Sequence, residues 1–148
     1  MNYSFDYSSN FIISEEDKVT LNFLEDALLA QSIGLFGGVL GKTATISAID
    51  EIYNKYRQNK VSIPNIDELI INSLTLGITA DVIAIKIAVS KYKYLLEKYE
   101  KGEINYSLKP NIILIYANLL GGLADLLSLL ATMQIANRKG IVIPRPVR

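Results

Sequence analysis

Asp81 and Asp125 are charged residues that stand inside long apolar stretches of the chain, at equivalent places in two similar segments. Lys42 lies on the matching flank of a third segment. A buried carboxylate is a candidate for proton chemistry when its surroundings shift its pKa, although a structural pairing explains most such residues. We therefore expect Lys42, Asp81 and Asp125 to be buried charges, with the lysine within side-chain reach of either acid.

The glycine-rich segment 34–43 has to be weighed as a phosphate-binding loop, because it ends in Gly41-Lys42-Thr43 as a Walker A motif does. The Walker spacing needs a glycine where this chain has Phe36. The motif also needs a preceding strand and a later strand with a second acid, and the sequence predicts neither. We expect no nucleotide site here.

The residue types that are missing exclude several classes of chemistry. The 148 residues include no cysteine, no histidine and no tryptophan, and 15 basic residues balance 15 acidic ones. Disulfides, thiolate nucleophiles, Ser-His-Asp triads and the common zinc sites are thereby excluded, as is the Glu-x-x-His motif of di-metal bundles. We expect no enzyme, no cofactor and no metal. The zero net charge disfavours general nucleic-acid binding, so that only the basic C-terminal arm could contact nucleic acid.

Three long helical segments are predicted, at 14–58, 65–102 and 110–140. Ser14 and Asn65 are good N-cap residues, each followed by acidic residues in the first helical turn. The second helix ends at a glycine, which is favoured just past a helix end, and the third has a proline in its first turn, where proline is tolerated. The connections are short, so successive helices should pack antiparallel.

The two ends of the chain differ from the helices. Residues 1–13 are rich in aromatic side chains without a helical period, and residues 141–148 contain two prolines that favour extended backbone. Disordered ends are usually polar, whereas these are apolar, so we expect both to bury against a neighbouring subunit. The chain should thus be one domain, 1–148, with a helical core over 14–140 and two terminal arms. The residues proposed for the C-terminal assembly arm are Ile141, Val142, Ile143, Arg145 and Arg148.

A weak internal repeat relates the three helices. Segments that begin at Leu76 and Leu120 match at an offset of 44 residues, and one that begins at Ile33 fits the same frame at an offset of 43. Projected on helices, the repeat gives each helix one face of small residues, a small-residue stripe with a constant 4, 3, 4, 4 spacing. The stripes are Ala30, Gly34, Gly37, Gly41 and Thr45; Ser73, Gly77, Ala80, Ala84 and Ala88; and Ala117, Gly121, Ala124, Ser128 and Thr132.

Small side chains let two helix backbones approach closely, which can offset the loss of about 1 kcal/mol that each mid-helix glycine suffers relative to alanine. Such faces are common between membrane helices, and tightly packed soluble bundles use them too. We therefore predict an all-α fold of three long antiparallel helices packed through these stripes. Whether the remaining apolar faces meet lipid or protein is open at this point.

Further features bear on a membrane location. The third helix is long enough to span a bilayer, and tyrosines interleave with basic residues near the helix ends, as at a membrane interface or at amphipathic ends in water. The basic residues show no asymmetry between the two sides, which disfavours a conventional transporter or channel. The first 26 residues hold six acids and one base, so no secretory signal peptide is expected. The default location is the cytoplasm or a virion-like assembly, with membrane association as the alternative.

Three functional hypotheses follow. The first is a non-enzymatic, self-assembling structural protein, such as a coat or shell subunit of a virus, whose partners are further copies of the chain and lipid. The second is a small membrane-permeabilising protein of the holin or pore-forming type. The third is a soluble helical immunity or adaptor protein.

Overall fold

The computed structural model describes residues 13–58 and 61–138, and three α-helices make up most of them. The helices are α1 (Glu15–Asn54), α2 (Ile66–Glu100) and α3 (Lys109–Arg138), and no strand occurs in these two ranges. The predicted all-α fold is confirmed. Of the two predicted arms, only Ile13 belongs to the described residues.

Local capping interactions explain where the helices begin and end. The Ser14 hydroxyl accepts a hydrogen bond from the Asp17 amide at 3.1 Å, and the Asn65 side chain accepts one from the Glu68 amide at 3.3 Å. Beyond α2, Gly102 has a φ of 73°, which a residue without a Cβ adopts readily. The N-caps and the glycine stop are those expected from the sequence.

The first helix ends four residues earlier than predicted, at Asn54. The Asn54 amide group donates to the Val61 carbonyl oxygen at 2.7 Å and accepts from the Val61 amide at 3.2 Å. These two bonds use both the amide and the carbonyl oxygen of Val61, as hydrogen bonds from a neighbouring β-strand would. The side chain thereby ties the end of α1 to the loop that follows it.

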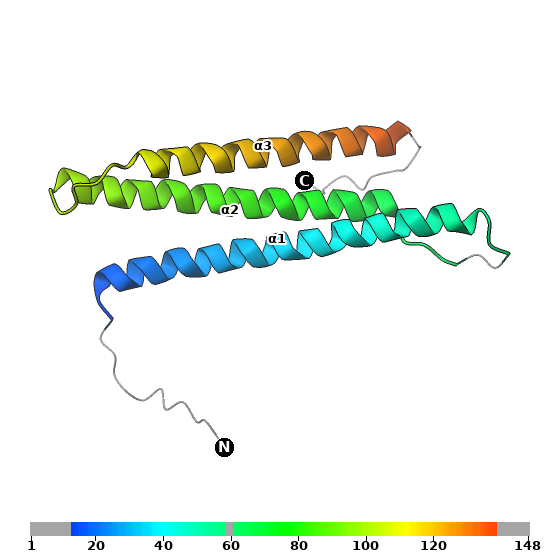
Figure 1. Cartoon of the computed structure of the whole chain (residues 1–148), viewed down its shortest axis with the longest axis horizontal. Coiled ribbons are helices and arrows are strands. Elements are labelled where there is room, and N and C mark those ends of the chain that lie inside the picture. Colours follow the sequence, from blue (N-terminus) through cyan, green and yellow to red (C-terminus); the bar gives the residue numbers. More distant parts are fainter. Residues whose placement is uncertain (1–12, 59–60, 139–148) are drawn as a thin grey trace, which may run out of the picture.

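The three helices lie side by side in a single layer, with α2 in the middle (Figure 1). Consecutive helices run antiparallel, and α2 packs against both α1 and α3. No Cα atom of α1 comes within 8 Å of one in α3. The fold is therefore a layer one helix thick, in which only the central helix has two neighbours.

This layer encloses no core of large side chains. Among the described residues no large side chain is fully buried, and the buried apolar residues are alanines: Ala30, Ala44, Ala88 and Ala136. A helix that is apolar on all sides normally lies inside a protein or a membrane. Here small residues mediate the close helix contacts, and many large apolar residues remain exposed.

Candidate membrane-contact surface

The interface between α1 and α2 is formed where their small-residue stripes face each other. A Cβ added at Gly37 would lie 3.0 Å from the Ser73 carbonyl oxygen and 3.3 Å from the Leu76 Cβ. A Cβ at Gly34 would lie 3.8 Å from that of Ala80. The Ser73 hydroxyl also donates a hydrogen bond to the Gly37 carbonyl oxygen at 2.7 Å. The glycines of α1 thus allow an approach that a larger residue at Gly37 would prevent.

The interface between α2 and α3 brings Gly77 of the α2 stripe together with residues that lie outside the stripes. Asp125 of α3 lies against Gly77, where an added Cβ would be 2.5 Å from the carboxylate oxygen. Asp81 of α2 lies against Gly122, with 3.4 Å between its Cβ and an added one. One turn further along, the Asn118 side chain donates to a backbone carbonyl oxygen of α2 at 3.4 Å. Each aspartate is accommodated by a glycine on the opposite helix.

The third stripe does not pack as the other two do. Ala117, Gly121, Ala124 and Ser128 are exposed, and only Thr132 is half-buried. The residues of α3 that reach α2 are offset from the stripe by one position, at Asn118, Gly122 and Asp125. The stripe of α3 therefore lies beside the contact face rather than on it.

The three expected buried charges also differ from one another. Asp81 and Asp125 are half-buried at the interface between α2 and α3. Lys42 is instead exposed on α1, and it makes no ion pair with any described residue. Because α1 does not touch α3, Lys42 is not brought to Asp125. Another lysine, Lys86, forms an ion pair with Asp26 across the interface between α1 and α2, at 3.7 Å.

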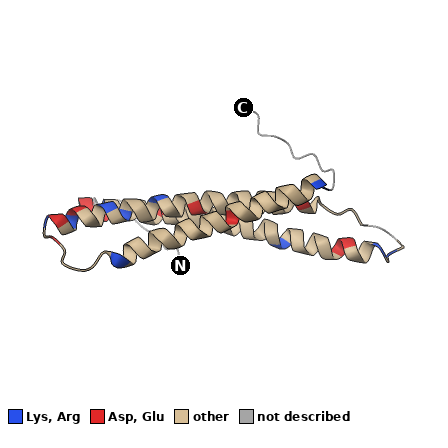
Figure 2. Cartoon of the chain, turned by 90° about the horizontal axis from the view of Figure 1, so that it is seen from above, with Lys and Arg blue, Asp and Glu red and all other residues tan. Residues whose placement is uncertain are grey.

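Large apolar side chains cover the outside of all three helices. Each helix is long and apolar enough to cross a membrane, and almost no residue in the apolar part of each helix is fully buried. Charged residues gather toward the helix ends, and the middle of the layer has few of them (Figure 2). The most exposed large apolar residues of the middle region include Leu28, Leu35, Phe36, Val39, Val82, Ile113, Leu120 and Leu127.

The apolar segments of the three helices lie level with one another. In sequence these segments are 27–49, 69–90 and 110–137, which contain only one or two charged residues each. The contacts between α1 and α2 and between α2 and α3 bring their central parts together. At about 1.5 Å per residue the segment of α2 is about 33 Å long, close to the hydrocarbon thickness of about 30 Å in a bilayer. We call this region the apolar belt.

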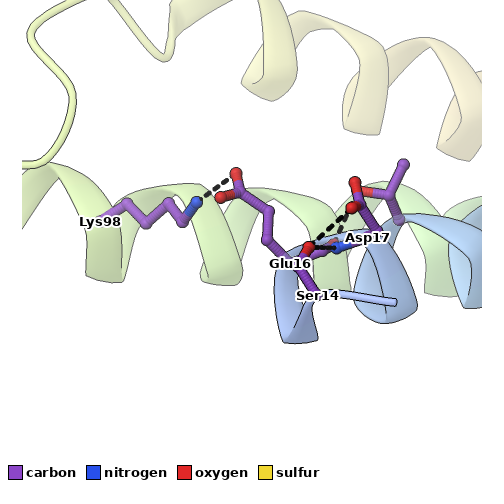
Figure 3. A network of polar contacts seen from close by, with 5 residues as sticks. Ser14, Glu16, Asp17 and Lys98 are labelled. Carbon is purple, nitrogen blue, oxygen red and sulfur yellow. Dashed lines mark hydrogen bonds and ion pairs between the residues drawn. The ribbon is translucent and has the colours of Figure 1, made fainter. Parts of the chain in front are cut away.

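One end of the layer is joined by an ion pair between α1 and α2 (Figure 3). The Lys98 ammonium lies 2.5 Å from the Glu16 carboxylate and 4.9 Å from the centre of the Tyr94 ring. The hydrogen bond to Glu16, and then that to Tyr94, raise the pKa of Lys98 above its ordinary value. Lys98 therefore keeps its charge at neutral pH, and it links the two helices outside the apolar belt.

A second ion pair lies on the last turn of α2. The Lys101 ammonium donates to the Glu97 carboxylate at 2.6 Å. This hydrogen bond, together with the charge of Lys101, lowers the pKa of Glu97, and the same contact raises the pKa of Lys101. Both side chains are exposed, so the pair contributes little to stability.

A groove between α1 and α2 is a feature that the sequence reasoning missed. It has a volume of about 320 Å³, and the Phe23 and Tyr94 rings meet edge to face in its wall, with their centres 6.4 Å apart. Lys91 and Lys98 also line it. The spacing of these two lysines and Tyr94 places them on one face of α2, a signal that could have suggested the groove.

Within the two described ranges, no group of three or more acidic residues is placed to hold a metal ion. The candidate site is therefore a surface, made of the apolar belt and of the charged ends that border it. Comparison of the chain with protein-family models, with curated proteins and with solved structures finds no match.

Proposed function

We propose that this chain is a non-enzymatic structural protein that inserts in a membrane and assembles there with further copies. The observation that carries the proposal is the apolar belt, which is level across three helices and in which almost no described residue is fully buried. Leaving such a surface in water would be costly, at about 25 cal/mol per Å² of apolar area. Lipid tails would cover it without that cost.

The distribution of charge supports the same proposal. Asp81 and Asp125 are in the middle of the belt, where each lies against a glycine of the neighbouring helix. Lys86 lies about one helical turn, and Lys42 about two turns, from opposite ends of the belt, and a long side chain can extend from there toward the headgroup region. The charges that would be costly in hydrocarbon are thus placed at a helix interface or near a boundary.

Cell fractionation tests the proposal. We expect the expressed protein to stay in the membrane pellet after alkaline carbonate extraction and to be released by detergent. Leu120→Lys places a charge on the exposed face of α3 at the middle of the belt, where insertion scales assign a cost of about 2.5–3.5 kcal/mol. This variant should shift toward the soluble fraction. Tyr56→Lys, at a residue that is 85% exposed outside the belt, is the matched control and should remain in the pellet.

Self-assembly provides the second candidate function, a shell subunit whose apolar belt is covered by other copies rather than by lipid. The same exposed side chains favour it, because protein surfaces can replace lipid around an apolar helix. Large particles that sediment without membranes and survive detergent would identify this form. A small soluble oligomer in the absence of detergent would contradict both candidates.

Release of a trapped dye from liposomes separates a structural membrane protein from a membrane-permeabilising one. The proposed structural role predicts insertion without release. Dye release by the wild-type chain at the concentrations where it inserts would favour the membrane-permeabilising hypothesis instead.

A further inference from the structure

We infer that the groove between α1 and α2 binds an anionic phospholipid, with the acyl chains against its apolar wall and the phosphate at Lys91. The inference rests on the proposed membrane insertion and adds the class of lipid and the place where it binds. The groove has a volume of about 320 Å³, which is enough for part of a lipid. The rest of the lipid would lie along the apolar belt.

The groove crosses the boundary between the apolar belt and the charged end of the layer. Its inner wall includes Leu24, Ala27 and Ile87, at the edge of the belt. Lys91 is one helical turn beyond Ile87, and Lys98 is two turns further. A ligand that follows the groove therefore meets hydrocarbon side chains first and ammonium groups next, which is the order of chemical groups in a phospholipid.

Charge complementarity favours an anionic lipid over a zwitterionic one. Lys98 is engaged by Glu16 at 2.5 Å, whereas Lys91 is exposed and makes no ion pair or hydrogen bond with a described residue. Basic pockets between membrane helices bind lipid phosphates in this manner. Tyr94 and Tyr106 also line the groove, and tyrosines are favoured at headgroup level.

The test uses the absence of tryptophan from the chain. Phe23→Trp places a single fluorophore in the wall of the groove, and Leu120→Trp places one on the outer face of α3. Each variant is reconstituted in phosphatidylcholine vesicles that contain phosphatidylglycerol, with brominated acyl chains on one lipid or on the other. Quenching of the tryptophan then reports which lipid is adjacent to it.

We expect phosphatidylglycerol to be enriched about fivefold beside the tryptophan at position 23, as one lysine near an anionic headgroup would give, and not beside that at position 120. Adding Lys91→Gln should abolish the enrichment. Lys93→Gln is the matched control, because Lys93 is exposed at nearly the same level but does not line the groove. It should leave the enrichment intact.

Several results would overturn the inference. These are equal quenching by the two lipids at position 23, an equal effect of the two lysine variants, and no quenching there because the chain itself or another copy fills the groove. If quenching at position 120 is normal, only the lipid site fails. If neither position is quenched, membrane insertion itself fails. Should Phe23→Trp not fold, native mass spectrometry of the unmodified protein with mixed lipids gives the same comparison, and retention without preference would refute the site.

Discussion

Gly37→Ala and Gly38→Ala add the same methyl group at adjacent positions of α1, but only one of these positions has room for it. Around Gly38 no atom lies within 4 Å of the added Cβ, so the variant should gain the helix propensity of alanine, about 1 kcal/mol. At Gly37 the new Cβ would lie 3.0 Å from the Ser73 carbonyl oxygen and 3.3 Å from the Leu76 Cβ. A backbone oxygen cannot move away as a flexible side chain can.

Overpacking of this kind typically costs about 1–3 kcal/mol. Gly37→Ala gains the same helix propensity of about 1 kcal/mol. Its net effect on the free energy of unfolding should therefore lie between no change and a loss of about 2 kcal/mol. Gly38→Ala should therefore be more stable than Gly37→Ala by about 1–3 kcal/mol. The two variants have identical composition, so differences in detergent binding or expression should largely cancel.

The comparison is made by unfolding each purified variant from a mild detergent with increasing dodecyl sulfate, while helix content is followed by circular dichroism. The midpoint should rise for Gly38→Ala relative to wild type and should not rise for Gly37→Ala. Equal shifts in the two variants would refute close packing of α1 on α2 at Gly37. If both variants were stabilised equally, the added Cβ at Gly37 would have to lie further than 3.0 Å from the Ser73 carbonyl oxygen.

Three further predictions concern other parts of the chain. In Gly77→Ala the new Cβ would lie 2.5 Å from the Asp125 carboxylate, which then has to move aside; in a double-mutant cycle with Asp125→Ala we expect a coupling energy of about 1 kcal/mol, and additive effects would contradict the contact. Lys101→Gln should raise the pKa of Glu97 toward its ordinary value, since Lys101 lowers it. The small stabilisation by this pair is present above the ordinary pKa and is lost as the pH falls through the lowered one; an unchanged midpoint in an NMR titration of Glu97 would refute the pairing. Deletion of 141–148 should leave helix content unchanged and lower the assembled mass measured by light scattering, whereas full-size assemblies would show that this arm is not needed.

The positions of the helices could be predicted because capping is local. Ser14 and Asn65 accept hydrogen bonds from amides three residues ahead, so the signal and its effect lie within one turn of the sequence. The end of α1 was placed too late for the opposite reason. The end of α1 depends on the hydrogen bonds of Asn54 to Val61 in the following loop. The periodicity of the helix sequence does not predict these bonds.

The contact faces could be predicted only in part. The repeat identified residues of α1 and α2 that meet, such as Gly37 and Ser73. It could not show that α2 must offer different faces to two neighbours, so that α3 makes contact through Gly122 rather than through Gly121 of its stripe. The expectation for Lys42 failed for two reasons. The first helix does not approach Asp125 on α3, and the packing of Gly41 on Ser73 places Lys42 about two helical turns from Asp81.

The groove was not foreseen because its walls come from distant parts of the sequence. Phe23 and Tyr94 become neighbours only through the antiparallel register of α1 and α2. Tyr106 is added by the connection between α2 and α3. A sequence pattern within one helix can place Tyr94 and Lys98 on the same face, but it cannot supply the opposite wall.

The layer arrangement has a consequence for how the chain acquires its structure. Each helix contacts only the helix that comes next or before it in the sequence, so each interface between helices needs only two consecutive helices. During synthesis from the N-terminus, α1 and α2 can form a complete hairpin before α3 leaves the ribosome. Contacts between consecutive segments also favour fast folding. The third helix then adds to a finished edge of α2, and a truncated product that ends before α3 retains the whole interface between the first two helices.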